Sequence, residues 1–387
     1  MHGAERPVAE ALGGVGAAGR ARAVVSAVAR EHGLAGSWTR VPAGEQSIAF
    51  ALDSGTTRYF VKVEDQTSAE RVDAAAALTD VAARNGVPVP RPRTARHGGW
   101  AIPVDGLVLS VSEWLPGRTL TAPVSPGQAE QIGTALGRLH QAFARLAPPP
   151  VAVTAVEEEW LRWDEEAVVT RWERAEALVR DRGDDPDGFD RVALAALTER
   201  RSWLTALGRV LTAAPPLTRQ WVHGDFAAPN LLFDGDRLVA VVDFANAGPH
   251  LIAYELGRIA FGPEIALSPN GEALSAAVLD AYVTANPAAT EADVAWAEAC
   301  AFVQLARSTY PVSARYAGTG RFRADLDDFW IRRQHTARLL QAHLPPLPSA
   351  LYRGLSPSNA VLVALSGPRT QPPRRSTWLG EGLMGAD

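Results

Sequence analysis

Short apolar runs dominate the chain up to about residue 115 and predict strands there. The stretch SIAFALDSGTTRYFVKV contains two such runs separated by an Asp-Ser-Gly turn, which is the pattern of a β-hairpin. A third run, LVLSVSEWL from Leu107 to Leu115, has strand composition and ends before a Pro-Gly pair. We therefore expect a small β-rich unit in this part of the chain.

An Ala-rich helical pattern, Ser68–Ala83, lies between these strands. It is followed by Asn85 and Gly86, whose residue types favour the left-handed cap that ends a helix, and then by the proline-rich VPVPRP. The first lobe is thus expected to run strand, strand, helix, strand. A separate amphipathic pattern at Ala21–Arg30 predicts a helix in an N-terminal extension covering residues 1–36.

Longer helical patterns follow from residue 116, beginning with AEQIGTALGRLHQAFARL. Because single hydrophobic cores usually stop growing at about 250 to 300 residues, a chain of 387 residues suits two lobes. The sequence predicts an α+β fold with a β-rich lobe at 37–115, a mainly helical lobe at 116–345 and a cleft between them. Residues 346–387 are rich in Pro, Ser, Gly and Arg and predict a flexible tail, although the apolar run Ala360–Ser366 could instead dock.

Composition and charge exclude several classes of function. A net charge of −5 provides no broad positive field, so we expect no nucleic-acid partner. No apolar stretch is long enough to span a membrane and no signal segment is evident, so we expect no membrane partner and a cytoplasmic location. The single cysteine, Cys300, cannot form an internal disulfide and is expected to be a small buried hydrophobe.

Acidic residues outnumber basic ones between residues 155 and 200, which makes this segment a candidate wall of a substrate site. A solvated helix face is the alternative interpretation. Trp160, Trp163 and Trp172 could stack on a substrate ring, but their helical spacing favours burial in the core.

The residues with the strongest chemical pattern are in WVHGDFAAPNLLFDGDRLVAVVDF. Two apolar strand-like pieces there are joined by an Asp-Gly-Asp turn, with Asp225 before the first piece, Asn230 at its start and Asp243 at the end of the second. A hairpin would bring these three side chains together at its open end. Magnesium prefers carboxylate and amide oxygens, so Asn230 and Asp243 are candidate metal ligands.

Asp225 lies five residues before Asn230, which matches the spacing D-x-x-x-x-N of phosphoryl-transfer enzymes. Because the reference pKa of an aspartate is about 3.9, it is a weak base for an alcohol. Its expected role is to orient the acceptor hydroxyl and to accept the proton late in the reaction.

The sequence HGDFAAPN followed by VVDF resembles the signature of the aminoglycoside phosphotransferase and choline kinase-like superfamily, over roughly residues 37–340. The resemblance implies a bilobal protein-kinase-like fold with a catalytic hairpin. It implies ATP (or GTP) and Mg²⁺ as cofactors, with Asp225 as the catalytic residue and Asn230 and Asp243 as magnesium ligands. His223 would hold the catalytic loop in place.

The resemblance also implies a nucleotide site in the first lobe. Lys62, in YFVKV, matches the lysine that contacts the phosphates, and it should pair with an acid on the following helix. Glu70 and Asp73 are three residues apart and could share a face of that helix. Glu70 is the favoured partner, and Asp73 stays open.

Two loops complete the expected nucleotide site. The stretch PAGEQSIAF occupies the place of the family's phosphate-covering loop, with Gly44 and Ser47 near the phosphates, unless it is a plain hairpin turn. The stretch VSEWLPG resembles the hinge, where the backbone of Ser112, Glu113 and Trp114 would meet adenine. Glu113 could alternatively be an ordinary edge-strand charge.

Two more segments resemble the family. LGRLHQ contains His140, which we expect to be structural, and GPHLIAYELGR follows the second magnesium ligand. Where the family commonly has Asp-Leu, this chain has Glu255 and Leu256, so whether this acid braces the loop is left open.

The expected function is O-phosphorylation of a small molecule that bears a hydroxyl group. The first candidate acceptor is an antibiotic of aminoglycoside, peptide or nucleoside type, in resistance or self-protection. The alternatives are a metabolic kinase for choline, a sugar or an amino alcohol, and a catalytically silent nucleotide-binding module. A silent module need not retain all of Lys62, Asp225, Asn230 and Asp243.

Overall fold

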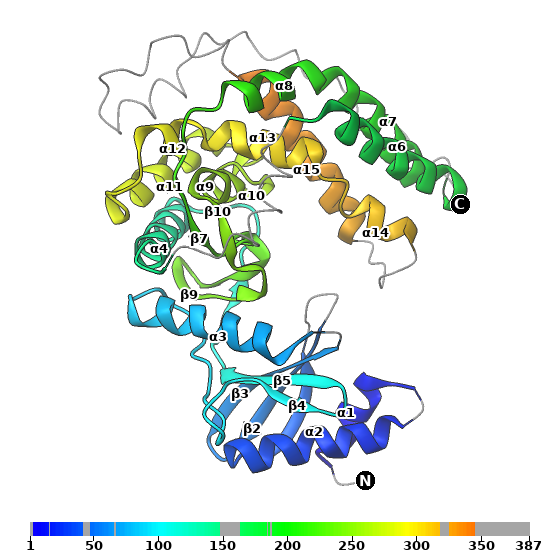
Figure 1. Ribbon diagram of the computed structural model, residues 1–387, viewed down its shortest axis with the longest axis vertical. Coiled ribbons are helices and arrows are strands. Elements are labelled where there is room, and N and C mark those ends of the chain that lie inside the picture. The colour runs from blue at the N-terminus through cyan, green and yellow to red at the C-terminus, as the bar shows by residue number, and fades with distance from the viewer. Residues whose placement is uncertain are drawn as a thin grey trace, which may run out of the picture.

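The protein is built from two lobes, a small one based on a β-sheet and a larger one made mainly of helices (Figure 1). This computed structural model describes residues 3–14, 16–41, 47–65, 67–147, 163–183, 185, 188–317 and 325–344. The expected α+β class and bilobal arrangement are confirmed. The predicted tail at 346–387, with its apolar run, lies outside the described residues.

A five-stranded antiparallel sheet forms the centre of the first lobe, with strand order β1-β2-β3-β5-β4. Its elements are β1 (Ser37–Val41), β2 (Ser47–Ser54), β3 (Thr57–Asp65), α3 (Ala69–Arg84), β4 (Ile102–Val104) and β5 (Leu107–Glu113). The predicted β2–β3 hairpin is present, with its turn at Gly55, which has a φ of 60°. The sequence analysis missed β1 and β4, because one has few buried residues and the other spans three residues.

Helices α1 (Glu5–Leu12) and α2 (Ala17–His32) cover one face of this sheet (Figure 1). Val24 and Val28 of α2 are fully buried in one cluster with Phe50 and Val61 of the sheet. The segment interpreted from the sequence as an extension therefore supplies one side of this hydrophobic layer.

Strand alternation directs charged residues to the other face of the sheet. Val61 and Val63 are buried against α1 and α2. Lys62 and Glu64 alternate with them along β3 and therefore point to the opposite side of the sheet. Helix α3 packs on that side through Val72. Ser68 accepts a hydrogen bond from the N–H of Arg71 and so caps the start of α3.

The second lobe surrounds two small sheets with helices. The strands are β6 (Arg118–Thr119), β7 (Arg219–Val222), β8 (Leu231–Asp234), β9 (Arg237–Val241) and β10 (Gly248–Leu251), arranged as β6-β8-β9 and β10-β7. The helices are α4 (Pro126–Phe143), α6 (Glu165–Arg182), α7 (Phe189–Arg200), α8 (Leu204–Ala213), α9 (Ile252–Ala260), α10 (Pro263–Ala266), α11 (Gly271–Ala285), α12 (Glu291–Ala295), α13 (Ala297–Arg307), α14 (Val312–Ala317) and α15 (Asp325–His343). Short 3₁₀ turns occupy Arg201–Trp203, Ala228–Asn230 and Phe244–Asn246.

Helices α4 and α11 approach each other closely. A Cβ atom at Gly133 of α4 would overlap the carbonyl oxygen of Val278, and one at Gly137 would lie 2.7 Å from the carbonyl oxygen of Tyr282. The two glycines therefore let the helix backbones meet. Trp172 is fully buried and donates its indole N–H to the carbonyl of Ala306, which agrees with the interpretation of this tryptophan as a core residue.

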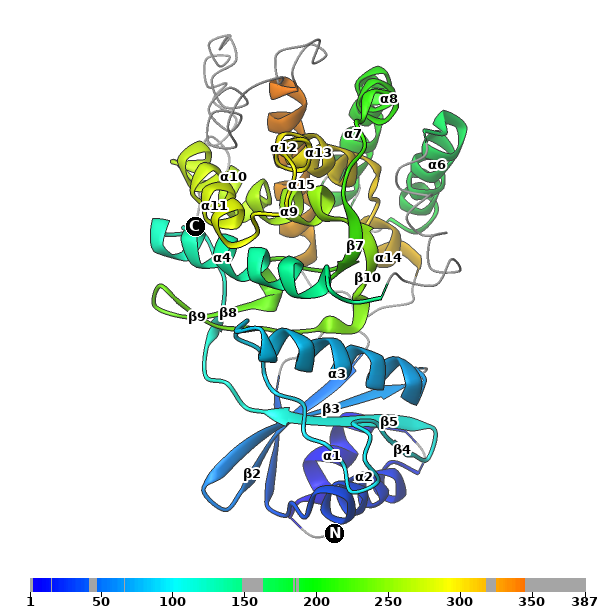
Figure 2. The same cartoon turned by 60° about the vertical axis from the view of Figure 1, so that its left-hand side comes forward.

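The two lobes meet at the face of the sheet that carries Lys62 (Figure 2). Val241 donates its N–H to the carbonyl of Pro88 at 2.7 Å, and Arg71 of α3 donates to the carbonyl of Ala245 at 3.3 Å. These contacts place the open end of the β8–β9 hairpin against the first lobe. Among the described residues, no helix is long and apolar enough to cross a membrane.

We expect Val28→Asp to reduce the free energy of unfolding by about 3 kcal/mol or more, because it buries an unpaired charge between α2 and the sheet. Ser26→Asp, on the exposed side of the same helix, is the control and should change it by less than about 0.5 kcal/mol. Urea denaturation measures both. Equal stability of the two variants would show that the α1–α2 layer does not pack on the sheet.

Candidate active site

The loop between β7 and β8 carries the HGD sequence and turns sharply at Gly224. This glycine has a φ of 79°, and a Cβ atom there would overlap the carbonyl oxygen of Asn246. Only glycine fits this position without displacing the neighbouring segment. The turn places Asp225 at the open end of the β8–β9 hairpin, where the sequence pattern predicts it.

His223 holds this loop from inside. The imidazole is fully buried, its Nδ1 accepts the N–H of Asp225 at 3.2 Å, and its Nε2 donates to the carbonyl of Val242 at 3.0 Å. Burial lowers the pKa of His223, which favours the neutral ring that these two bonds require. His223 thus ties the backbone of the catalytic loop to the end of β9.

Glu255 of α9 braces the same loop. Its carboxylate is 2 % exposed and accepts the N–H groups of His223 at 3.0 Å and Gly224 at 2.6 Å, together with Nε2 of His140 at 2.9 Å. Burial alone would raise the pKa of Glu255, but the hydrogen bond and charge of His140 outweigh it and leave the pKa lowered. The bracing role left open by the sequence therefore belongs to Glu255.

The hydrogen-bonded chain continues away from the site. Nδ1 of His140 lies 2.8 Å from the hydroxyl of Tyr282, and Asn286 donates to the same hydroxyl at 3.1 Å. His140 is fully buried, as expected of a structural histidine. Helices α4, α9 and α11 are thus connected to the loop between β7 and β8 through hydrogen bonds between buried groups.

Asp225 is held on both sides. The side-chain amide of Asn230 donates to its backbone oxygen at 2.8 Å and to Oδ2 at 2.9 Å, and the guanidinium of Arg258 forms an ion pair with Oδ1. Both carboxylate oxygens are therefore oriented before any substrate binds. Arg258 was missed in the sequence analysis, although it follows Glu255 by three residues and so shares its helix face.

Asp243, the last residue before a 3₁₀ turn, adopts an unusual backbone conformation. Its φ of 66° is in the left-handed region, which non-glycine residues rarely occupy away from functional sites. Its Oδ1 lies 3.3 Å from Nζ of Lys62, so the two residues predicted for metal and phosphate binding are in contact across the lobes.

The expected pairing of Lys62 with Glu70 is wrong in this structure. Lys62 instead binds Glu64, at 3.2 Å, which is two residues further along the same strand and therefore on the same face. Glu70 lies in the first turn of α3, where hydrogen bonds from its own backbone N–H and from Ser68 lower the pKa of its carboxyl. Asp73 accepts the N–H groups of two residues before β4.

The predicted contacts of Gly44, Ser47 and the hinge with the nucleotide stay predictions, but the structure defines the hydrogen bonding of some of these residues. Ser47 begins β2 and pairs in register with Glu64, whereas Gly44 lies outside the described residues. The N–H of Glu113 donates to the carbonyl of Arg91 at 3.1 Å, so this group is engaged within the first lobe. Adenine would therefore have to use other backbone groups of the hinge.

Ser112 and Trp114 flank this position. Ser112 pairs in register with Phe60, and the indole of Trp114 lies 6.4 Å from the ring of Phe60. The guanidinium of Arg58 lies over the indole at 5.5 Å. Trp114 is thus held against the edge of the sheet by an aromatic and a cation–π contact.

The oxygen atoms at the centre of the site fit a magnesium ion. Both amide hydrogens of Asn230 face Asp225, which directs Oδ1 of the amide elsewhere, and the carboxylate of Asp243 is 40 % exposed. Carboxylate and amide oxygens with water and phosphate are the ligands that Mg²⁺ prefers. No group of three or more His, Cys, Asp or Glu suited to a metal occurs in the described part of the chain.

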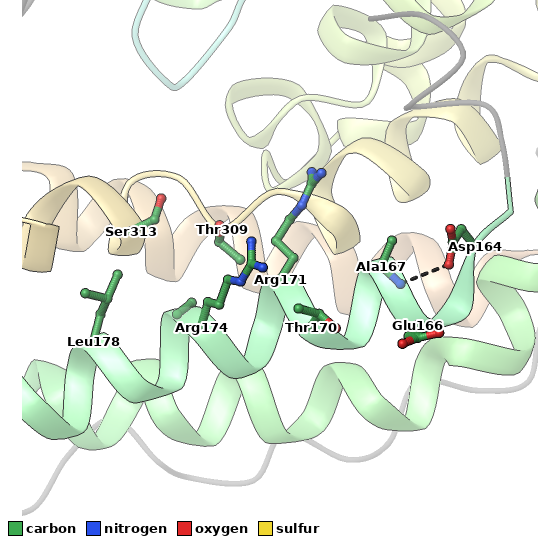
Figure 3. A pocket seen from close by; sticks show the side chains of 10 residues that line it. Asp164, Glu166, Ala167, Thr170, Arg171, Arg174, Leu178, Thr309 and Ser313 are labelled. Carbon is green, nitrogen blue, oxygen red and sulfur yellow. Dashed lines mark hydrogen bonds between the residues drawn. The ribbon is translucent and has the colours of Figure 1, made fainter. Parts of the chain in front are cut away.

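A cavity of about 530 Å³ lies in the second lobe between α6 and the segment that joins α13 to α14 (Figure 3). Asp164 and Glu166 line one end of it and Arg171 and Arg174 lie further along α6. The predicted substrate wall is therefore hollowed, and its described lining carries both signs of charge. Trp163 packs on the core at Gly208, while Trp160 lies outside the described residues.

Comparison with known proteins identifies the family. Residues 37–297 match the sequence model of the phosphotransferase enzyme family. The chain belongs to this family. It is accordingly a small-molecule kinase, and the resemblance noted from HGDFAAPN and VVDF is confirmed.

Curated relatives of this phosphotransferase include two homoserine kinases. The protein from Methylobacillus glycogenes is 26 % identical over 259 residues, which are 66 % of this chain and 73 % of the relative. The protein from Granulibacter bethesdensis is 28 % identical over 180 residues, which are 46 % of this chain and 49 % of the relative. The second match thus spans about half the length of that relative.

Solved structures with the same fold include antibiotic kinases and a metabolic kinase. A spectinomycin phosphotransferase in complex with ADP and spectinomycin superposes with a TM-score of 0.51 at 13 % identity, covering 89 % of this chain and 97 % of that one. An amicoumacin kinase in complex with AMP-PNP and Ca²⁺ gives 0.52 at 14 %, covering 84 % and 95 %. A microcompartment-associated aminopropanol kinase gives 0.53 at 15 %, covering 83 % and 96 %.

Glu255→Ala should lower the free energy of unfolding by about 3 to 5 kcal/mol, because it leaves two backbone N–H groups and His140 without their shared acceptor. Glu130→Ala, on the exposed face of α4, is the control and should change it by less than about 0.5 kcal/mol. Chemical denaturation at neutral pH provides the measurement. If both variants unfold at the same urea concentration, Glu255 does not brace the loop.

Proposed function

We propose that this phosphotransferase transfers the γ-phosphate of ATP to a hydroxyl group of a small molecule with the help of Mg²⁺. The observation that supports this most is the arrangement of Asp225, fixed by Asn230 and Arg258, at the same hairpin end as Asp243 and Lys62. Phosphoryl transfer depends mainly on positioning and on charge stabilisation, and these are the properties of such an arrangement.

Each residue has a distinct role in this proposal. Asn230 and Asp243 would hold Mg²⁺, which when bound neutralises charge on the phosphates. Lys62 would bind the phosphates from the first lobe, and Asp225 would orient the acceptor hydroxyl and accept its proton late in the reaction. The ion pair with Arg258 holds the carboxylate of Asp225 in place for that step.

The nature of the acceptor separates two candidates. An antibiotic acceptor is supported by the shared fold with spectinomycin and amicoumacin kinases, and a metabolic acceptor by the sequence similarity to homoserine kinases. A purely acidic wall for a cationic antibiotic receives little support from the described residues. Glu176 is committed to Arg180 and Arg201, and the cavity includes Arg171 and Arg174.

The retention of a complete set of polar groups argues against a silent nucleotide-binding module. An NTP-consumption screen against antibiotics, sugars, hydroxy acids and amino alcohols, followed by mass measurement, tests the proposal directly. Transfer adds about 80 Da to the acceptor as a phosphoryl group. Tight nucleotide binding without such an addition to any acceptor would favour the silent module.

Asp225→Asn is expected to lower kcat by about 10²- to 10⁴-fold, because an amide cannot accept the proton and loses the ion pair with Arg258. The Kd for nucleotide should change by less than about threefold, since Asp225 orients the acceptor. Asp234→Asn, an exposed carboxylate at the tip of the same hairpin, is the matched control. Turnover comparable to that of the control would exclude Asp225 as the catalytic residue.

Asp243→Asn is expected to raise the Mg²⁺ concentration for half-maximal activity by about tenfold or more, because it removes a negatively charged oxygen ligand. A magnesium titration at saturating nucleotide makes the measurement, with Asp234→Asn again as the reference. An unchanged magnesium requirement would remove Asp243 from the metal site.

A further inference from the structure

A buried arginine, Arg333, lies on α15 near the second lobe's part of the active site. It is 9 % exposed, and its guanidinium lies over the ring of Phe329 at 5.2 Å. Its Nε has no hydrogen-bond partner among the described residues. Glu264 is the acid whose charge acts on it, but the carboxylate of Glu264 binds the neighbouring Arg332 at 3.4 Å.

A second buried arginine shows what a structural guanidinium looks like in this fold. Arg200 is fully buried, but it donates to the side-chain oxygen of Gln334 at 3.0 Å and to the carbonyls of Ala306 and Ser308 at 3.0 and 2.6 Å. Those oxygens compensate for the loss of water around the charge. Arg200 keeps these bonds although its Nη2 lacks a partner, whereas Arg333 has an Nε without a partner among the described residues.

The surroundings of Arg333 connect it to Asp225. Burial lowers the pKa of Arg333 to about 10, and the positive charge of Arg258 contributes to this shift, so the two guanidinium groups are close to each other. Arg258 in turn binds Oδ1 of Asp225. A guanidinium has five N–H donors, so Arg258 can hold Asp225 and contact a ligand at the same time.

The same surroundings connect Arg333 to the cavity in the second lobe. Tyr310 contributes to the electrostatic environment of Arg333, and its ring lies 6.3 Å from that of Phe329, on which Arg333 stacks. The preceding residue, Thr309, lines the cavity of about 530 Å³ between α6 and α14 (Figure 3). Residues 309 and 310 are thus shared between the wall of the cavity and the surroundings of Arg333.

We propose that Arg333 and Arg258 form an oxyanion subsite for the acceptor, and that the acceptor is a small molecule carrying a carboxylate besides its reactive hydroxyl. This inference rests on the proposed kinase function. A buried guanidinium whose Nε has no partner among the described residues would be stabilised by the negative charge of a ligand. A bidentate carboxylate matches the planar fork of a guanidinium. Binding of that carboxylate would direct the hydroxyl end of the molecule to Asp225.

The first test compares acceptors that differ only in the carboxylate. L-homoserine and 3-aminopropan-1-ol are such a pair, as are L-serine and ethanolamine. The wild-type enzyme should favour the acid in a pair by about 100-fold in kcat/KM, because an acceptor without the carboxylate leaves the guanidinium of Arg333 without a bound anion. Arg333→Met should reduce this preference to less than about tenfold by lowering kcat/KM for the acid alone.

The control for this experiment is Arg332→Gln. Arg332 is adjacent on α15 and pairs with Glu264, so its replacement removes the same charge without removing the subsite. The preference for the acid should persist in this variant. Equal or better phosphorylation of the amines by wild type overturns the inference while the proposed function stands. It is also overturned if Arg333→Met lowers turnover of both members equally and raises KM for ATP, because the anion is then the nucleotide's.

A second test does not depend on turnover. Arg333→Met should unfold at the same temperature as wild type or higher, because an uncompensated charge is replaced by an apolar chain, whereas Arg200→Met should unfold at a lower temperature. With Mg²⁺ and AMP-PNP present, L-homoserine and L-serine should raise the unfolding temperature of wild type but not of Arg333→Met. If no acceptor gains a phosphoryl group, the proposed function fails, and an absent shift with both acids overturns the subsite as well.

Discussion

The buried carboxylate of Glu255 is the interaction on which the geometry of the site depends. It accepts two successive backbone N–H groups of the catalytic loop and the imidazole of His140, all within an interior that excludes water. A charge in such a place is stable only when its hydrogen-bonding capacity is filled. The requirement works in both directions, because the loop can satisfy its own N–H groups only by remaining in the conformation that presents Asp225.

Arg333 shows the opposite arrangement of a buried charge. Glu255 is a buried charge with every partner inside the protein, whereas Arg333 is a buried charge whose Nε lacks a partner in the described structure. The first type of group rigidifies a loop, and the second leaves binding energy for a ligand. The proposed acceptor site thus combines a rigid catalytic end at Asp225 with an uncompensated positive end, and this polarity would orient an asymmetric substrate.

Much of the site was predictable because its residues are close in sequence. Asp225, Asn230 and Asp243 belong to one hairpin, so local spacing was enough to bring them together. The partner of Lys62 was predicted incorrectly, because strand alternation placed Glu64 on its face of the sheet while Glu70 was engaged at the start of α3. The spacing of Arg258 from Glu255 indicated a shared helix face, but the roles of Arg258 and Arg333 depend on which acids remain available after the helices have packed.

In the fold, too, features set by neighbouring residues were predicted, whereas packing between residues far apart in the chain was not. The β2–β3 hairpin and the left-handed Gly86 after α3 follow from residue types within a few positions, and they occur where expected. The docking of α1 and α2 on the sheet depends on contacts between residues far apart in the chain, and an Ala-rich helix shows no preference for a particular partner.

The close contact of α4 and α11 at Gly133 and Gly137 has a mechanical meaning. Helices whose backbones are in contact cannot shift or tilt independently, so α4 and α11 form one rigid unit. His140 of α4 and Tyr282 of α11 are hydrogen-bonded to each other. His140 also binds Glu255, which holds the loop between β7 and β8. The position of Asp225 thus depends partly on two glycines, Gly133 and Gly137, whose lack of a side chain lets α4 and α11 pack closely.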